Sequence, residues 1–244
     1  MYEDVLYDAM FRRRSVRKYS GPLEPDMMDK VRNFAHSLTP LRSEIRTELR
    51  FLDNEEVKGL FKVDAPHFLA LYSEPADGSA ANAGFMLQQM DLFLSANGIG
   101  SCWQGGSRPV AMGQGEKRAD FISLAFGMPA EQVHRRDVNE FKRKALGEVT
   151  SLEGMEKLLE PGRLAPSAMN KQSWYFTSSE NVVRVHHARS SLLNRMNRIN
   201  AGIALCHIWL AALHEMGGAE LVIEEDGDGG SPKGFSYVAS VRTK

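Results

Sequence analysis

The length of 244 residues allows a large buried core, arranged as one large domain or two small ones. Hydrophobic residues make up 43% and charged residues 25% of the chain, which excludes a disordered or fibrous protein. The formal net charge of −1 gives no support for binding to nucleic acid or to an anionic membrane surface, so neither partner is expected.

Three further features indicate a cytoplasmic protein. Two cysteines, Cys102 and Cys206, are too few for a disulfide framework and suit a reducing compartment. Residues 1–10 carry acidic side chains and lack an apolar centre, so no signal peptide is expected. The most apolar stretch, 203–213, is too short to cross a bilayer core of roughly 30 Å.

Four helices are predicted from caps and apolar spacing. Asp26 can cap the first, whose apolar residues between 27 and 38 share one face. Asn82 opens the second, which is apolar on nearly every side and ends at glycines. Thr150 with Glu153 forms a capping-box pattern before the third. Asn200 opens the fourth, which is also apolar all round, so the second and fourth helices should be central and buried.

Strands are predicted between and after these helices. The candidate strands, in chain order, are 68–72, 123–126, 174–177, 182–185, 221–223 and 235–241. The tract 224–233 is rich in Asp and Gly and is predicted to be an exposed loop. Because helices and strands do not alternate regularly, the pattern favours an α+β fold over a doubly wound sheet.

The chain repeats itself. Four pairs of similar segments occur in the same order, namely 11–14 with 141–144, 38–40 with 164–166, 82–85 with 200–203, and 121–126 with 235–240. This order favours a duplicated unit over two helix-strand units that are alike by coincidence. The predicted repeats are residues 1–148 and 149–244, and two copies of one unit are expected to pack about a pseudo-twofold axis, as an intrachain pseudo-dimer.

An arginine-rich segment near the N-terminus is the first candidate for chemistry. Residues 12–18 hold five cations and Ser15. Arginine offers planar, paired donors that suit phosphate. A solvated charged segment explains the same spacing equally well, whereas a nucleic-acid patch has little other basic sequence to support it.

Two segments of the second half could complete such a site. Residues 142–144 form a second cationic cluster at the seam between the repeats, where alone they would be a surface linker. Residues 165–170 follow a predicted helix, and Pro166, Ser167 and Asn170 are typical of a turn. By itself this segment would be read as a plain turn.

Other reactive patterns are weaker. The glycine-rich stretch 98–106 would let a ligand approach the backbone, but it has neither a dinucleotide fingerprint nor a P-loop lysine. Cys102 within it is more typical of a structural thiol than of a nucleophile. No metal site is expected, because His186 and His187 are adjacent on a predicted strand and should face opposite sides of it.

Taken together, these segments resemble the nitroreductase family of flavoproteins, and in particular its members with the flavin-binding unit duplicated in one chain. The matching segments are 13–17, 82–103, 141–144 and 165–172. Ordinary members are homodimers with two FMN sites at the interface, where the arginine motif of one subunit meets the proline-serine motif of the other. The resemblance therefore implies a nitroreductase-like fold with FMN as cofactor.

The two repeats differ from the family pattern in a complementary way. The first keeps the arginine motif but has 39–42 in place of the proline-serine motif, and the second keeps 165–167 but has 142–147 in place of the arginine motif. The resemblance therefore implies one complete site per chain, which makes a monomer plausible. The residues that it places around the cofactor are Arg13, Arg14, Ser15, Arg17, Trp103, Gln104, Gly105, Lys142, Lys144, Pro166, Ser167 and Asn170.

Within that set, the resemblance gives Arg13, Ser15, Lys142 and Lys144 the phosphate side. It places Arg17 beside the flavin edge that gains negative charge on reduction. The predicted activity is transfer of electrons from NADH or NADPH through FMN to a small acceptor such as a nitroaromatic or a quinone, by a ping-pong mechanism without a dedicated acid-base residue. The alternatives are a flavin-binding protein without turnover, as a carrier or sensor, and a degenerate structural or interaction protein with no cofactor.

Overall fold

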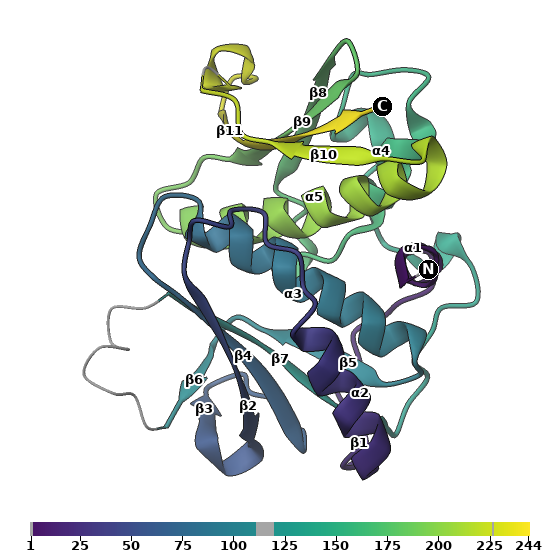
Figure 1. Cartoon of the computed structure of the whole chain (residues 1–244), viewed down its shortest axis with the longest axis vertical. Helices are drawn as coiled ribbons and strands as arrows, with labels where there is room; N and C mark the ends of the chain where they lie inside the picture. The colour runs from purple at the N-terminus through teal and green to yellow at the C-terminus, as the bar shows by residue number, and fades with distance from the viewer. Residues whose placement is uncertain (1, 111–119, 226) are drawn as a thin grey trace.

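The computed structural model describes residues 2–110, 120–225 and 227–244, and it places its two larger sheets on either side of a central pair of helices (Figure 1). The helices are α1 (Tyr2–Met10), α2 (Pro25–Ala35), α3 (Ser79–Ala96), α4 (Glu156–Leu164) and α5 (Asn194–Met216). The strands are β1 (Tyr19–Gly21), β2 (Thr47–Asp53), β3 (Val57–Gly59), β4 (His67–Ser73), β5 (Gly100–Gln104), β6 (Ser107–Pro109), β7 (Asp120–Pro129), β8 (Trp174–Ser179), β9 (Val182–Ala188), β10 (Ala219–Val222) and β11 (Phe235–Thr243). The architecture confirms the predicted α+β class with long central helices.

The first sheet is organised around β7. β4, β5 and β1 each pair antiparallel with β7, and β2 pairs antiparallel with β4. The sequence predicts a glycine-rich loop at residues 98–106, but most of it is strand. The backbone of β5 pairs in register with β7, with Cys102 opposite Ala125, and this pairing outweighs the low strand preference of glycine.

The second sheet contains the four strands predicted between 174 and 241. Its order is β10-β11-β9-β8, and each neighbouring pair is antiparallel. The tract 224–233 connects β10 to β11 and includes the short 3-10 helix Gly227–Gly230. Residue 226 of that tract lies outside the described residues.

The predicted helix starts are wrong by several residues. Glu24 rather than Asp26 precedes α2, because Pro25 takes the first helical position. Thr150 does not cap α4, which begins at Glu156, since its hydroxyl donates to the Phe176 carbonyl at 3.0 Å. α3 and α5 begin before Asn82 and Asn200.

The side-chain amides of Asn82 and Asn200 hold loops instead of capping helices. Asn82 Oδ1 accepts hydrogen bonds from the backbone N–H groups of Leu41 and Arg42, at 2.8 and 3.1 Å. Asn200 Oδ1 accepts one from the N–H of Ala168 at 3.0 Å. Asn82 therefore fixes the segment that follows α2, and Asn200 fixes the segment that follows α4.

α3 and α5 approach closely at two glycines. A Cβ atom on Gly84 would lie 2.2 Å from the carbonyl oxygen of Ile199, and one on Gly202 would lie 2.0 Å from that of Ala81. Each glycine thus faces the residue three positions before the other glycine, so the contact is reciprocal. This geometry agrees with a pseudo-twofold arrangement, while the duplication and its boundary after residue 148 stay predictions.

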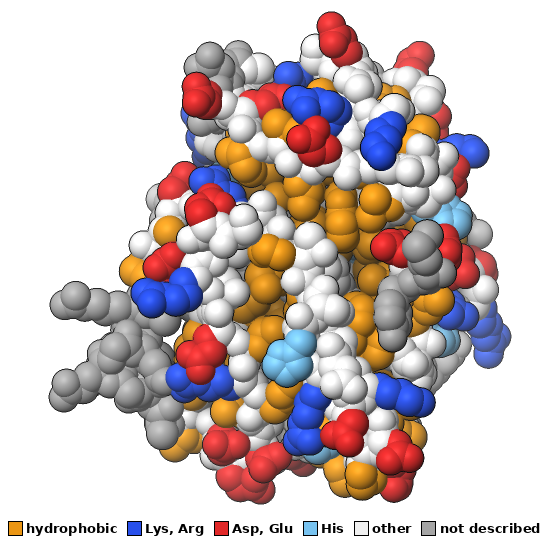
Figure 2. All heavy atoms as spheres, viewed as in Figure 1, with side chains coloured by type: hydrophobic (Ala, Val, Ile, Leu, Met, Phe, Trp, Pro, Cys, Tyr) orange, Lys and Arg blue, Asp and Glu red, His pale blue; other side chains and the backbone are white. Residues whose placement is uncertain are grey.

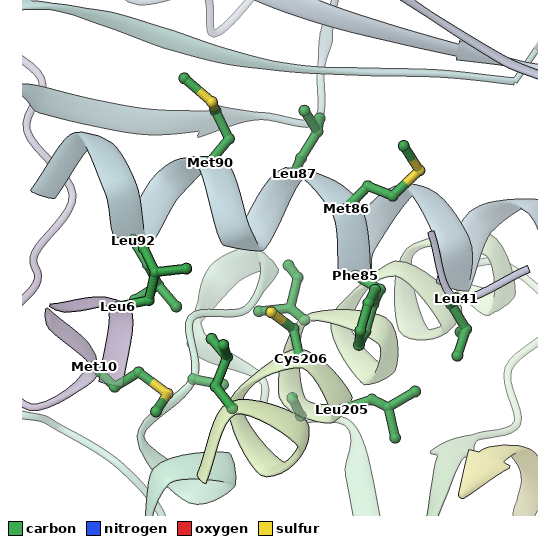
Figure 3. Close-up of a cluster of buried hydrophobic side chains, with 14 of the residues drawn as sticks. Leu6, Met10, Leu41, Phe85, Met86, Leu87, Met90, Leu92, Leu205 and Cys206 are labelled. Carbon is green, nitrogen blue, oxygen red and sulfur yellow. The ribbon is translucent and has the colours of Figure 1, made fainter. Parts of the chain in front are cut away.

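The core extends through both halves of the molecule. Every residue from Ser79 to Ser95 of α3 is buried. Figure 3 shows Met86, Leu87 and Met90 pointing to one side of α3, and Phe85 and Leu92 pointing to the opposite side, toward α5 and α1. One continuous cluster of buried apolar side chains includes α1, both central helices and both sheets. The two halves are therefore packed as one body around α3 and α5.

α5 is long and apolar enough to cross a membrane by length and composition. It has 23 residues, more than the stretch 203–213 on which the sequence prediction relied. In its most apolar window, 72% of the residues are buried inside the fold, as in a core helix of a soluble protein. Figure 2 shows a band of hydrophobic side chains across one face, at the level of the seam between α3 and α5, with charged side chains of both signs around it.

We expect Gly202→Ala to lower the free energy of unfolding by about 1–3 kcal/mol, because the added methyl group must displace the Ala81 carbonyl. The higher helix preference of alanine works in the opposite direction by about 1 kcal/mol. Urea unfolding followed by circular dichroism measures the difference. Gly147→Ala is the control, since its Cβ would meet no atom within 4 Å. Equal stability of the Gly202→Ala variant and the wild-type protein would contradict the close crossing.

Candidate functional site

Two adjoining pockets lie between the arginine-rich segment and the loop after α4. They share Ser15, Arg17, Pro166, Ser167 and Met169. We call the first the apolar pocket, and its further lining residues are Cys102, Trp103, Gly105, Ile122, Ala168, Met196, Ile199, Asn200 and Ile203. We call the second the cationic pocket, and its further lining residues are Arg13, Arg14, Arg135, Glu140, Lys142, Arg143 and Asn170. The apolar pocket is open to solvent on one side and is lined mostly by apolar side chains, as small-molecule sites usually are.

The arginine-rich segment runs beside β5 on its way from α1 to β1. The Val16 N–H donates to the Ser101 carbonyl at 2.8 Å, and the Val16 side chain is fully buried. Because neighbouring side chains of an extended segment point to opposite sides, burial of Val16 directs Ser15 and Arg17 to the pockets. Glu131 fixes this stretch further, since its carboxylate accepts from the Arg17 N–H at 2.7 Å.

The loop after α4 is held in an unusual conformation. Met169, Asn170 and Gln172 have φ angles of 52°, 55° and 48°, in the left-handed region that disfavours non-glycine residues by roughly 1–2 kcal/mol each. The cost is offset by hydrogen bonds to the loop, including one from the Gln172 N–H to the Ser167 hydroxyl at 2.9 Å. Strained backbone of this kind is often found at functional sites.

Arg143 and Asn170 join the two halves of the site. The Arg143 guanidinium donates to the carbonyls of Leu164 and Ala165, at 3.2 and 3.0 Å, and to Asn170 Oδ1 at 2.7 Å. Asn170 Nδ2 in turn donates to the Lys142 carbonyl at 2.6 Å. The second cationic cluster is therefore bound directly to the proline-serine loop.

The cationic pocket holds more positive charge than its acids balance. Burial and the neighbouring Arg13 and Arg14 lower the pKa of Arg135 to about 10. Burial, Arg13 and Arg135 lower the pKa of Arg143 to about 9. Among the described residues that line this pocket, Glu140 is the one carboxylate. An anion in the pocket would relieve this repulsion, so the arrangement suits a phosphate group.

Beneath the pocket lies a buried polar network. Arg13 is 1% exposed and pairs with Asp91 of α3, with 2.9 Å between Nε and Oδ2. Gln88 links Asp91 to His207 of α5, whose Nδ1 lies 2.8 Å from the Pro161 carbonyl. Burial lowers the pKa of His207 to about 3, so this histidine is neutral at ordinary pH.

Ten of the twelve residues expected around the cofactor line these pockets, and Gln104 and Lys144 do not. The Gln104 side chain accepts from the Val63 N–H at 3.1 Å and donates to the Trp103 carbonyl at 3.1 Å. The Lys144 ammonium group donates to the Gln172 carbonyl at 3.2 Å. Both side chains are therefore occupied with neighbouring backbone and support the site from outside.

Several lining residues were not expected from the sequence. Arg135 reaches the cationic pocket with its guanidinium 4.0 Å from the Phe141 ring centre, in a cation–π contact that no spacing rule reveals. Arg143 belongs to the predicted cationic cluster 142–144, where the resemblance singles out its two neighbours. The residues from α5, such as Ile199 and Ile203, look like ordinary core positions of an apolar helix.

Cys102 lines the apolar pocket as a buried thiol. Burial raises the pKa of this thiol above its usual value of 9.0, and the nearby Arg17 offsets only part of that shift. The thiol is therefore protonated at neutral pH and is a poor nucleophile. Its contribution to the pocket is its shape and low polarity.

Comparison with known proteins places the chain in a family. The family model described as "Putative TM nitroreductase" matches residues 5–212. The chain belongs to this family. Membership in the nitroreductase family supports an oxidoreductase activity. No curated protein matches the chain.

Solved structures extend the comparison to the nitroreductase fold. A "putative nitroreductase" from Thermotoga maritima is 21% identical and has a TM-score of 0.67, covering 97% of this chain and 93% of that one. This likeness shows that the protein has the nitroreductase-like fold. A nitroreductase family protein from Clostridium difficile is 17% identical, with a TM-score of 0.46 and coverage of 61% and 97%. A nitroreductase with bound FMN from Desulfitobacterium hafniense is 12% identical, with a TM-score of 0.41 and coverage of 58% and 98%.

We expect the stability of this nitroreductase family member to fall with acidification because of His207. Its pKa is 6.5 in an ordinary environment and about 3 in the fold. Between these values the unfolded chain takes up a proton that the folded chain does not, so this residue lowers the free energy of unfolding by about 1.4 kcal/mol for each pH unit below 6.5. Its contribution is fully present above that pH.

The measurement is urea unfolding at several pH values across this window, compared between wild type and His207→Gln. The variant should show a shallower decline of stability with falling pH, whatever its stability at neutral pH. Identical slopes for the two proteins would show that His207 does not remain neutral in the fold.

Proposed function

We propose that this protein binds one FMN per chain and uses NADH or NADPH to reduce a small acceptor such as a nitroaromatic or a quinone. The observation that carries the proposal is the direct junction of an apolar pocket with a cationic one, between the arginine-rich segment and the loop after α4. FMN has the same two parts, a flat ring system and a phosphate. Family membership supports the oxidoreductase class of this activity.

The residues present fit this cofactor. The unbalanced cluster of Arg135, Arg143 and Lys142 would hold the phosphate, together with Arg13 and Ser15. Pro166 and Ser167, together with Trp103 and Gly105, line the apolar pocket and would contact the ring system. The Ser167 oxygen accepts from the Gln172 N–H, so its hydrogen remains available to a ligand.

Bound FMN would supply the redox chemistry, by accepting a hydride and returning the electrons to the acceptor. The chain would bind and orient the partners and shape the electric field. Arg17 reaches both pockets, so its cation would act on the ring system as well as on the phosphate end. The proposal needs no acid-base side chain in the apolar pocket.

The position of the apolar pocket beside the cationic one supports a ping-pong order. The ring system and its reacting partner would both lie against the walls of this one pocket. The nicotinamide donor and the electron acceptor would therefore occupy the same space in turn. Trp103, Met196 and Met169 offer adaptable apolar surface for partners of different shape.

The same proposal includes a monomer in the cytoplasm. Both half-motifs of the site come from one chain, so no second subunit is needed to complete it. Both cysteines are free and buried, which suits a reducing compartment.

We expect the purified protein to bind added FMN and the bound flavin to lose its absorbance near 450 nm, about where oxidised flavins absorb, when NADH or NADPH is added without oxygen. Steady-state assays with a quinone and a nitroaromatic would follow. A protein that holds FMN but is not bleached by either nicotinamide would contradict the proposed enzyme and favour a flavin carrier. A protein that binds no FMN would contradict both.

We expect Arg17→Ala to weaken FMN binding about tenfold, or about 1.4 kcal/mol, because a charge-assisted contact to the cofactor is lost. Loss of the cation should also make the flavin harder to reduce, with a midpoint potential lower by about 30 mV for two electrons. Lys18→Ala is the matched control, because Lys18 is also exposed and cationic but lines neither pocket. Equal affinity and potential in Arg17→Ala and wild type would remove Arg17 from the site.

A further inference from the structure

We propose that Asp91 is a positioning residue for the phosphate end of the site, which it controls from the core through Arg13 and Ser15. The proposal rests on the proposed FMN site. Asp91 lies in the second half of α3 and is fully buried. A carboxylate at such a position is costly unless it is paired and hydrogen-bonded, so its contacts need an explanation.

Two hydrogen-bond donors and one cation converge on the Asp91 carboxylate. The Ser101 hydroxyl donates to Oδ1 at 2.6 Å, and Gln88 Nε2 donates to Oδ2 at 3.3 Å. Arg13 Nε lies 2.9 Å from Oδ2 as an ion pair, although its N–H makes no hydrogen bond in the described structure. The carboxylate is therefore held from two elements, α3 and β5, and can in turn hold Arg13.

Arg13 transmits this constraint to the pocket. Its side chain is buried and lines the cationic pocket, and its Nη2 donates to the Ser15 hydroxyl oxygen at 3.2 Å. Since that oxygen already accepts from Arg13, the hydrogen of the Ser15 hydroxyl is left to donate to a ligand. Ser15 lines both pockets. Asp91 lines neither pocket, but through Arg13 it sets the direction in which Arg13 and Ser15 can donate to a phosphate group.

The far side of the network fixes the orientation of Asp91. The Gln88 amide nitrogen also lies 3.0 Å from His207 Nε2, and His207 Nδ1 lies 2.8 Å from the Pro161 carbonyl. A carbonyl only accepts, so Nδ1 carries the proton and Nε2 accepts from Gln88. His207 therefore donates to Pro161, and Gln88 donates both to His207 and to Asp91. Pro161 lies in α4, shortly before the proline-serine loop, so the network reaches the base of both halves of the site.

Charge and position predict opposite effects of removing this carboxylate. If Asp91 acted only as a negative charge near the pocket, its neutralisation would strengthen the binding of an anion. If it acts by positioning Arg13 and Ser15, the same change weakens binding of the phosphate group. The sign of the effect therefore separates the two roles.

The test compares FMN with riboflavin, which lacks the phosphate, by quenching of flavin fluorescence on binding. The readout is the ratio of the two affinities. For Asp91→Asn we expect the preference for FMN to fall about tenfold, with little change for riboflavin. Glu140→Gln is the matched control, because it also removes one negative charge, and in the described structure Glu140 accepts from the Arg136 N–H and forms no hydrogen bond or ion pair with Arg13. In this variant the preference should rise. An unchanged or increased preference in Asp91→Asn would overturn the proposal.

A double variant tests whether Asp91 acts through Arg13. Arg13→Gln alone should lower the preference for FMN, and adding Asp91→Asn should lower it no further. Independent, additive losses would overturn the proposal.

If the circular dichroism of Asp91→Asn shows that this variant does not fold, Ser101→Ala is the deciding variant, because it removes the donor to Asp91 Oδ1 and leaves the ion pair. It should lower the preference about threefold, and an unchanged preference would overturn the proposal.

These outcomes are distinct from failure of the proposed function. A wild-type protein that binds neither flavin would contradict the FMN site itself. A wild-type protein that prefers FMN to riboflavin, with an Asp91→Asn variant that keeps that preference, would contradict the role of Asp91 alone.

Discussion

The close contact between the backbones of α3 and α5 is the constraint on which the rest of the structure depends. It exists because Gly84 and Gly202 have no side chain to separate the helices. The contact brings the first half of α5, with Ile199 and Ile203, to the wall of the apolar pocket. It also places α3 beneath the arginine-rich segment, so that Asp91 meets Arg13. Both pockets are therefore supported by the centre of the core.

The loops after α2 and α4 are held in the same way, but only the loop after α4 lines the two pockets described above. Asn82 and Asn200 use their side-chain oxygens in the same way, each to hold the loop of its own half. In the loop held by Asn200, Ser167 lines both pockets. In the loop held by Asn82, the residue at the matching place in the predicted repeat is Leu41, which is buried in the core. In the predicted repeat, an apolar core residue therefore stands where the other half has a polar residue that lines the pockets.

The arginines of the site differ in how their charges are balanced. The Arg13 charge is balanced inside the fold by Asp91, and burial of the pair is expensive without further hydrogen bonds. Among the described residues, Arg135 and Arg143 have no comparable acid, and their pKa values are lowered first by burial and then by repulsion from neighbouring arginines, which an anion would offset. Holding these arginines together lowers the free energy of unfolding, but it leaves the pocket already arranged for a negatively charged group. Such preorganisation reduces the reorganisation that binding would otherwise require.

The sequence was most informative where local chemistry and periodicity agree. The all-round apolar character of the helices that contain Asn82 and Asn200 predicted their central position, which the structure confirms. The apolar runs of the second half predicted all four strands of its sheet. Helix starts were less predictable, because Asn82, Thr150 and Asn200 form tertiary hydrogen bonds that replace the caps which their residue types suggest.

By itself, the sequence determined the mixed fold, the buried central helices and the two separate motifs that could face one ligand. Only the tertiary structure decided that β5 is a strand, that Gln104 and Lys144 turn away from the pockets, and that Arg135 joins them. The physical reason is that residue type and spacing fix what a side chain can donate or bury. Its actual partner depends on which segments the crossing of α3 and α5 brings within hydrogen-bonding distance, as it does for Asp91 and Arg13.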